Sequence, residues 1–416
     1  MSAWPRITIL APFQVRSFRF QWSADLLTSW GLEMEILILS WYILVETQSV
    51  LLLTLFGALQ YFGTLIAPIF GMVGDRLGHR RVLATMRALY AILATALLTL
   101  AFTGTLRPVH VFIIAALTGL LRPSDIGMRT ALVADIMPPD RLMASVGISR
   151  TTSDTARIAG SLAGAGLYAA LGMGSAYLVI AAFYILGSAL TLRVAVTQST
   201  PPPLGTAALS PLRDLGDGLI HVWRMPPLLA GMWLAFLVNM TAFPLTGGLM
   251  PYIAKDVYHI GQTGLGTLVA SFAFGGLLGS LAVSLGGRAI RPARLMIVFS
   301  LIWYAVLLVF VQMRDPTAGR LILVLAGFAQ SLSMVPLAVM LLNQAGERFR
   351  GRVMGVRMLA IYGLPLGLLA AGALIDFFGY VPVASFYCVF GLVMTLLIAL
   401  RWRADLWPRD APANAR

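Results

Sequence analysis

Acidic and basic side chains inside long apolar segments are the residues of this sequence most able to do chemistry. A charged group at membrane depth costs a few kcal/mol or more unless it is paired or hydrated, so each is a functional candidate. Acids set among arginines can take up and release a proton as their partners change. Three predicted helices, over residues 20–44, 109–136 and 142–171, contain these candidates: Asp25, Glu33 and Glu35; Arg122, Asp125 and Arg129; and Arg150, Asp154 and Arg157.

The acids of the first helix cannot all face the same way. At about 100° per residue, Glu33 and Glu35 point about 200° apart, whereas Asp25 and Glu33 are about 80° apart. Asp25 and Glu33 could therefore border one cavity, two turns from each other. We favour Glu33 as the cavity residue, and Glu35 stays the alternative.

The other two groups form ladders. Each has an acid between two arginines at spacings of three and four residues, which places all three side chains on one stripe of a helix. The two helices are predicted to run antiparallel, and the ladders then lie at matching depths. If they face each other, they serve either as a permanent salt-bridge brace or as a titratable network that shares protons or substrate with the first helix.

The second half of the chain has neutral polar groups in place of these charges. Its first four predicted helices have no charge in their interiors, and Asn239, Gln330 and Asn343 are the polar exceptions. We count Asn239 among the candidate cavity residues and expect proton coupling to reside in the first half. The Phe, Met, Leu and Gly residues of the second half would form an apolar, adaptable wall.

Composition indicates a membrane protein. The chain is 59% hydrophobic and only 11% charged, whereas soluble domains carry about 25% charged residues. A spanning helix needs roughly 20 apolar residues, so 416 residues hold about twelve. The sole cysteine, Cys388, excludes an internal disulfide, and the four histidines show no ligand spacing. No metal, cofactor or enzymatic site is expected.

The predicted fold is an all-α membrane protein with twelve transmembrane helices in two pseudo-symmetric six-helix halves. Residues 1–194 form the first half, 195–225 a linker, 226–401 the second half and 402–416 a tail. The linker contains Pro201, Pro202 and Pro203, followed by a segment from Leu212 to Trp223 that could lie amphipathically on the membrane surface.

Basic residues set the predicted orientation. Outside the predicted helices, nearly all arginines fall on the side that also has both termini, and only Arg107, Lys255, Arg314 and Arg320 fall on the other. Positive charge accumulates on the cytoplasmic side of membrane proteins, so both termini are expected in the cytoplasm. This placement also explains the net charge of +13 without a nucleic-acid partner.

An internal repeat supports two parallel halves. Residues 156–172 align without gaps to residues 363–379, so that Gly160 meets Gly367 and Gly172 meets Gly379, 207 residues apart. A second match, at an offset of 213, pairs residues 73–81 with the basic turn around Arg288. Repeats in the same order are typical of transporters built from two parallel six-helix halves.

The basic turn at residues 71–83 carries the most specific motif. It resembles the loop between helices 2 and 3 of the major facilitator superfamily, whose pattern is roughly G-x-x-x-D-R-x-G-R-R. The residues that match are Gly71, Asp75, Arg76, Gly78 and Arg80, with Arg81 as a further charge, and His79 departs from the pattern. The resemblance implies a transporter in which Asp75 and its arginines latch the cytoplasmic side.

Other segments resemble one branch of this superfamily, the third group of drug:proton antiporters, which includes siderophore and macrolide exporters. They are residues 18–23 with Gly31, Glu33 and Glu35; residues 121–125 with 131–135; and the glycine-rich run 156–166. Two features of this branch are missing. Many of its antiporters have an arginine in the outer part of the fourth helix, which the predicted helix over residues 109–136 lacks there. They also have a glycine-proline pair in the fifth helix, and the predicted helix over residues 142–171 has no proline in that motif.

These features together predict a secondary active transporter of a bacterial inner membrane. It would export a small amphiphilic compound by alternating access, as a monomer in the lipid bilayer, with a proton gradient as the energy source. The main alternative is an importer of a metabolite, peptide or lysolipid on the same fold. A membrane scaffold or intramembrane enzyme is the remote alternative, because no nucleophile–base pair or metal-ligand set lies in a predicted helix.

Overall fold

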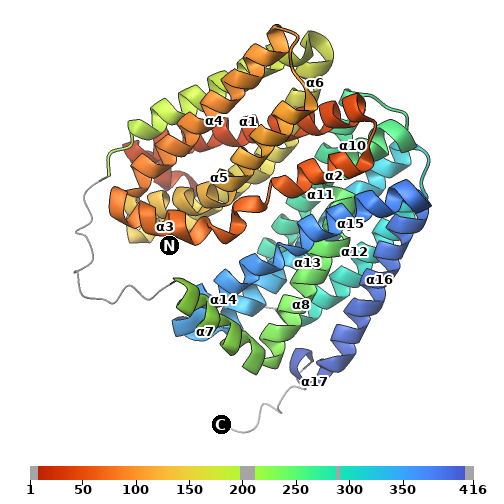
Figure 1. Ribbon diagram of the computed structural model, residues 1–416. Helices are drawn as coiled ribbons and strands as arrows, with labels where there is room; N and C mark the ends of the chain where they lie inside the picture. The colour runs from red at the N-terminus through yellow and green to blue at the C-terminus, as the bar shows by residue number, and fades with distance from the viewer. Residues whose placement is uncertain (1–7, 197–210, 287–290, 408–416) are drawn as a thin grey trace, which may run out of the picture. The chain divides into compact units, whose positions relative to one another are not determined.

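The long apolar stretches of the chain form α-helices. In the computed structural model, residues 8–196, 211–286 and 291–407 are described, and these contain no β-strand (Figure 1). Nine of their helices are long and apolar enough to cross a membrane. One of the nine contains two spans, and two further spans consist of shorter pieces, so the chain has the twelve spans predicted.

The first half begins with a short 3-10 helix, η1, before its six spans. The second span is interrupted near Gln60, and the fifth and sixth form one element that bends at Gly172. The bounds are η1 Thr8–Gln14, α1 Arg16–Thr47, α2 Val50–Leu59, η2 Phe62–Leu65, α3 Ala67–Leu77, α4 His79–Phe102, α5 Pro108–Ile136 and α6 Pro139–Leu192.

The second half is preceded by a separate helix, α7, where the sequence predicts an amphipathic segment. Its own first span is broken into α8, α9, α10 and the π-helical turn η3. The bounds are α7 Pro211–Arg224, α8 Pro226–Thr241, α9 Phe243–Thr246, α10 Met250–Tyr252, η3 Ile253–Val257, α11 Gln262–Gly286, α12 Pro292–Gln312, α13 Pro316–Gln344, α14 Gly346–Ala360, α15 Gly363–Phe378, α16 Tyr380–Arg401 and α17 Arg403–Leu406.

Local sequence explains several helix starts. Five long helices begin with proline, whose fixed φ and missing N–H suit the first helical position. Asp315 caps α13 by accepting a hydrogen bond from the Ala318 N–H at 2.7 Å. Ser49 caps α2 in the same way, with 3.3 Å to the Leu52 nitrogen.

The backbone confirms the internal repeat. Gly172 bends α6 with φ 77° and ψ 177°, and Gly379 separates α15 from α16 with φ 80° and ψ 167°. Only glycine adopts this backbone conformation easily. The glycines aligned in sequence also make matching contacts, because Gly160 lies against Glu33 and Gly367 against Met240. Both members of each contact are 207 residues from their counterparts, so the repeat includes α1 and α8.

By contacts the chain divides into two compact units. The first comprises residues 1–207 and 251–270, and the second comprises 208–250 and 271–416. In the first unit, Arg80 Nη1 donates to the Val194 carbonyl at 2.9 Å, and Ser17 Oγ donates to the Ala195 carbonyl at 2.8 Å. The start of α1, the turn between α3 and α4 and the end of α6 therefore lie at one end of this unit.

Candidate functional site

Four buried charged side chains form a cluster inside the first half. The Asp25 cluster consists of Asp25 on α1, Arg87 on α4, and Asp125 and Arg129 on α5. Asp25 is 3% exposed, Asp125 is 1% exposed and Arg87 is fully buried. Two carboxylates thus meet two guanidinium groups, which is the balance that permits charges to remain buried.

Arg129 is the centre of the cluster. Its Nε lies 3.3 Å from Asp25 Oδ1, and its Nη2 donates to Asp125 Oδ2 at 2.8 Å. Its Nη1 donates to Ser29 Oγ at 2.9 Å. Arg129 therefore joins its own helix to α1 through two separate contacts.

Arg87 completes the cluster from the opposite side. Its guanidinium pairs with Asp25 and also donates to the hydroxyl of Thr191 on α6. Gln21 adds a hydrogen bond of 2.8 Å from its amide nitrogen to Asp25 Oδ1. Arg87 was not among the candidate residues predicted from the sequence, yet its side chain is fully buried and contacts both α1 and α6.

Close packing of α6 on α1 positions these groups. A methyl group added to Gly187 would lie 2.7 Å from Thr28 Oγ1, and one added to Gly31 would lie 2.8 Å from the Tyr184 ring. Ser188 on α6 also donates to the Ala84 carbonyl of α4 at 3.0 Å. The small residues allow α1, α4 and α6 to approach until Arg87 reaches Asp25.

Glu33 has a looser environment than the Asp25 cluster. Its Oε1 is 3.8 Å from Arg122 Nη2, and both side chains are about a quarter exposed, at 25% and 24%. Arg122 also reaches Gln60 at the end of α2, with 3.5 Å between Nη1 and Oε1. Arg122 thus lies between the first and second spans and is held firmly by neither.

A glycine contact explains why Gln60 lies near Arg122. A methyl group on Gly119 of α5 would lie 1.9 Å from the Leu59 carbonyl oxygen, which leaves room only for hydrogen. The second half has the same crossing, where a methyl on Gly327 would lie 2.0 Å from the Phe272 carbonyl oxygen. The fourth span of each half therefore packs directly on the backbone of the second.

Glu35 is buried on another side of α1. It is 5% exposed and accepts a hydrogen bond of 2.7 Å from the Tyr184 hydroxyl of α6. The Tyr184 ring lies 5.5 Å from the ring of Tyr90, one turn along α4 from Arg87. Among the described residues the buried Tyr90 hydroxyl has no hydrogen-bond partner, and neither has Asp125 Oδ1. Buried polar atoms of this kind are commonly satisfied by water.

Among the described residues, the ion pairs of the first ladder that reach another helix run to α1. Arg122 and Arg129 of the first ladder make their ion pairs with acids of α1, in addition to the Arg129–Asp125 pair. In the second ladder Asp154 pairs with Arg150 of its own helix at 3.5 Å, and Arg150 is 76% exposed. Arg157 lies one turn beyond Asp154 on α6. The ion pairs of Arg122 and Arg129 therefore link α5 to α1.

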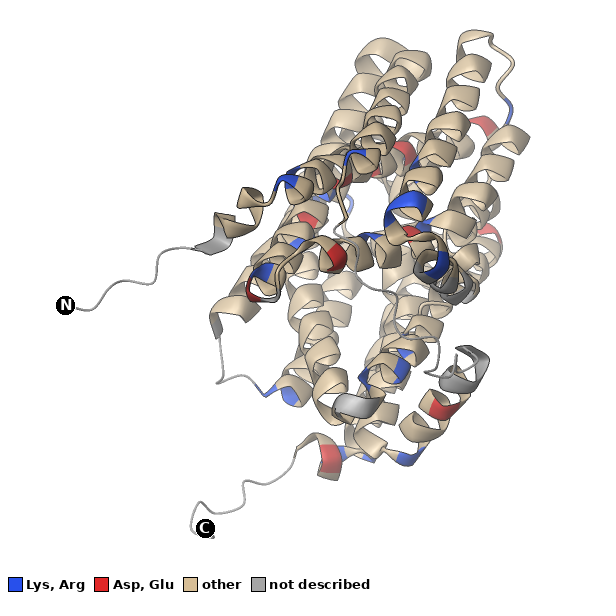
Figure 2. Cartoon of the chain, turned by 90° about the vertical axis from the view of Figure 1, so that its left-hand side faces the viewer, with Lys and Arg blue, Asp and Glu red and all other residues tan. Residues whose placement is uncertain are grey.

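The described interior of the second half contains paired hydroxyl groups. Thr241 and Tyr304 are 2.6 Å apart, as are Ser300 and Ser333. Asn239, predicted as a cavity residue, is half-buried and donates to the Ala235 carbonyl of its own helix at 2.8 Å. Figure 2 shows acidic and basic residues at scattered points along otherwise uncharged helices.

The predicted gating loop is a tight turn between α3 and α4. Gly78 has a φ of 88°, and Arg76 and Arg81 are exposed. His79 Nδ1 is 2.7 Å from Asp135 Oδ2 at the end of α5, which adds to the Arg80 contact with α6. Gly71 lies on α3, and the side chain of Asp75 falls outside the described residues, as do Pro201–Pro203 and Arg288.

No metal centre is apparent in the part of the chain that the structure describes. There, no three His, Cys, Asp or Glu side chains lie close enough together to hold an ion.

Two repeated halves of six spans, with buried ion pairs in the first, define a multi-pass membrane protein of the transporter class. The family model of the Major Facilitator Superfamily matches residues 22–365 and, in a second match, residues 232–416. The chain belongs to the Major Facilitator Superfamily. Its fold is that of secondary transporters that work by alternating access, and it is not an enzyme.

Several solved structures share the fold at low sequence identity. A bacterial homolog of the human lysosomal transporter Spinster, inward-facing and unoccupied, has a TM-score of 0.73 at 14% identity and covers 97% of this chain and 99% of its own. The nucleoside transporter NupG has a TM-score of 0.69 at 14% identity, and the match covers 95% of this chain and 100% of the NupG chain. The E. coli fucose:proton symporter FucP has a TM-score of 0.61 at 18% identity, and the match covers 93% of this chain and 98% of the FucP chain. No curated protein matches the sequence.

Proposed function

We propose that this protein exports a small amphiphilic compound across a bacterial inner membrane in exchange for protons, with Glu33 as the proton-binding residue. The observation that carries the proposal is the contrast between two acids of α1. Asp25 is buried and paired with two arginines, whereas Glu33 is partly exposed and only loosely paired with Arg122. A group that binds and releases protons in each cycle needs access to water, and this favours Glu33.

The Asp25 cluster acts in this proposal as a brace. It joins α1, α4 and α5 through ion pairs that are buried and balanced in charge. A proton on Asp25 would leave two guanidinium groups against one carboxylate, which is unfavourable without water. The cluster therefore holds the first half together while Glu33 changes its charge.

Protonation of Glu33 changes how Arg122 is held. With Glu33 ionised, Arg122 has a carboxylate on α1 and the Gln60 amide oxygen on α2. A proton on Glu33 removes this ionic partner and, with it, the negative charge that a cationic amphiphile would contact at the same carboxylate. Proton binding and substrate binding thus compete for Glu33, which is the coupling that an antiporter requires.

The second half supplies the substrate wall in this proposal. Its neutral hydroxyl pairs and abundant Phe, Met and Leu residues suit an amphiphile better than a strongly charged metabolite. We propose in addition that both termini are cytoplasmic, that the protein acts as a monomer, and that Asp75 with Arg76, Arg80 and Arg81 latches the cytoplasmic side. The resemblance to drug:proton antiporters supports export.

Transport by the purified chain in proteoliposomes tests the proposal, with ethidium as the amphiphilic probe. With an acidic lumen, antiport should concentrate ethidium inside. Glu33→Gln should abolish this accumulation yet retain ethidium exchange at equal pH. Glu46→Gln is the matched control, because Glu46 lies exposed near the end of the same helix. Gradient-driven accumulation by Glu33→Gln at the unaltered rate would contradict the assignment, and accumulation only with an alkaline lumen would indicate proton symport.

A further inference from the structure

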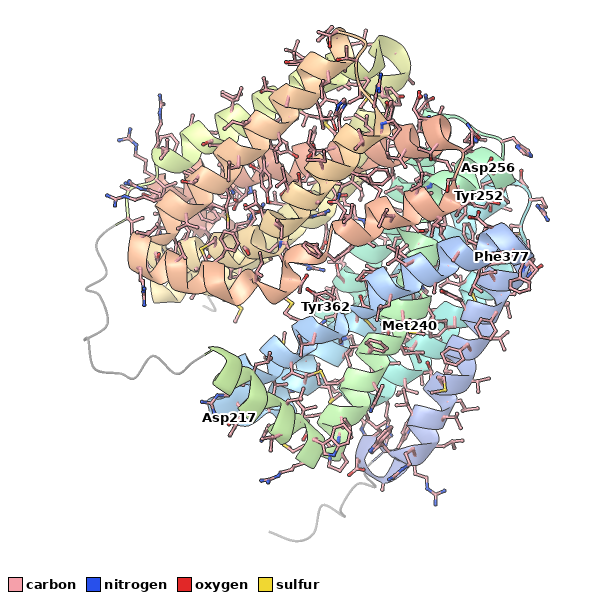
Figure 3. The ribbon with its side chains drawn as sticks, viewed as in Figure 1. Asp217, Met240, Tyr252, Asp256, Tyr362 and Phe377 are labelled. Carbon is pink, nitrogen blue, oxygen red and sulfur yellow. The ribbon has the colours of Figure 1, made fainter. Side chains whose placement is uncertain are left out.

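A groove lies between α8 and α16 of the second unit. Its cavity has a volume of about 510 Å³, within the range of roughly 300–1,000 Å³ that holds small ligands. Its walls are almost wholly apolar, with Trp233, Phe236 and Met240 from α8 and Phe390, Met394 and Leu397 from α16. Figure 3 marks Met240 on α8.

The groove is open at the surface of the second unit, because Trp233 is 47% exposed and Leu397 is 51% exposed. Both residues belong to apolar helices, and α16 is long enough to span a membrane. In a bilayer the molecules beside such a surface are lipid chains. Methionine and aromatic side chains adapt readily to a flexible chain.

The level of the membrane surface is indicated independently by α7. Leu219, Ile220 and Trp223 form an exposed apolar face on this helix, although Val222 is buried. A helix of this kind lies in the headgroup region with its apolar face toward the acyl chains. A second cavity of about 310 Å³ is lined by residues of α7 and shares Trp233 and Phe236 with the groove. The groove therefore begins at the headgroup level.

A basic residue lies at that same end of the groove. Arg401, the last residue of α16, is one of the groove-lining residues, and its guanidinium lies 5.5 Å from the ring centroid of Trp402. Arg403 follows on α17, with Asp405 beyond it. A guanidinium at the headgroup level offers the planar donors that phosphate oxygens accept.

We propose that this groove binds one anionic phospholipid of the surrounding bilayer. An acyl chain lies along the groove between α8 and α16, and the phosphate contacts Arg401 beside the Trp402 ring. The apolar walls, the exposure within a membrane-spanning surface and the single basic residue at the mouth match the parts of such a lipid. The site is separate from the proposed proton-coupling residues of the first half.

Native mass spectrometry of the delipidated full-length protein with phosphatidylglycerol or phosphatidylcholine tests the proposal. Two matched pairs of variants isolate the groove. Arg401→Gln and Arg403→Gln remove the same charge from exposed residues two positions apart. Leu397→Trp and Leu396→Trp add the same bulk at similarly exposed positions, of which only Leu397 lines the groove. Melting temperatures confirm that each variant is folded.

Arg401→Gln should weaken phosphatidylglycerol binding about fivefold, the effect of one basic residue at an anionic surface. It should weaken phosphatidylcholine binding less, because the choline cation offsets the charge of the same phosphate. Leu397→Trp should weaken both lipids. Arg403→Gln and Leu396→Trp should change neither. Equal effects within either pair would overturn the proposal, because lipid would then bind the protein surface without preference for the groove.

Discussion

Replacing Asp25 with asparagine would leave the two arginines of the Asp25 cluster with one carboxylate in place of two. Asparagine has nearly the same shape, and its amide can still bond to Gln21, so little besides charge should change. Arg87 is fully buried and cannot turn to water, and the Arg129 side chain is only 13% exposed. Removal of one partner from a buried ion pair costs about 3–5 kcal/mol, because the other charge stays buried. For a half of this size, the apparent melting temperature should fall on the order of 10 °C.

Thermal unfolding of the purified protein in one detergent measures this effect. Asp154→Asn is the control, because Asp154 pairs with the exposed Arg150, and such pairs contribute about 1 kcal/mol or less. The double variant Asp25→Asn with Arg87→Met should recover part of the lost stability, since it removes the unpaired charge. If Asp25→Asn and Asp154→Asn lower the melting temperature equally, or the double variant is no more stable than Asp25→Asn, the brace is refuted.

Three further predictions concern packing and gating. Gly119→Ala should sharply reduce the yield of folded protein measured by size-exclusion chromatography, because its methyl group would lie 1.9 Å from a carbonyl oxygen. Gly166→Ala should give the normal yield, because Gly166 has open space around it. Tyr184→Phe should cost about 1–3 kcal/mol of unfolding free energy in thermal melts by leaving buried Glu35 without its donor, and an unchanged melt would contradict this. Asp75→Asn should increase the inward-open population, which would lengthen the distance between one label on the loop after the second span and another on the loop after the eighth. An unchanged distance would refute the latch.

The fold could be predicted because its signals are local or periodic. Apolar runs gave the number of spans, and small-residue matches at a fixed offset gave the two halves. Gly172 and Gly379 illustrate this best, since the repeat aligned them and both have a positive φ in the structure. The breaks near Gln60 and Ala242 were not predicted, because both lie in continuous apolar sequence that an unbroken helix would also fit.

The charged site was only partly predictable. The positions of the acids and arginines along each helix follow from sequence, but their partners depend on how each helix is rotated against its neighbours. Arg87 lies only six residues after Arg81 of the basic turn, and its sequence position does not show that it is buried. It reaches Asp25 only because α6 packs closely on α1 at Gly187. Spacing within a helix shows which side chains share a stripe, and the packing of other helices decides what that stripe faces.

The repeat shows how charge can be confined to one half of a symmetric fold. Gly160 packs on α1 at Glu33, and its counterpart Gly367 packs on α8 at Met240, so a carboxylate and a thioether occupy equivalent places. Both contacts depend on the missing side chain of the glycine, and the helix crossing therefore tolerates either residue. The first half can then change its charge with proton binding while the second keeps the same helix crossings without ionisable groups at this position. This division of roles places the proposed coupling at Glu33, where the partly exposed carboxylate meets Arg122.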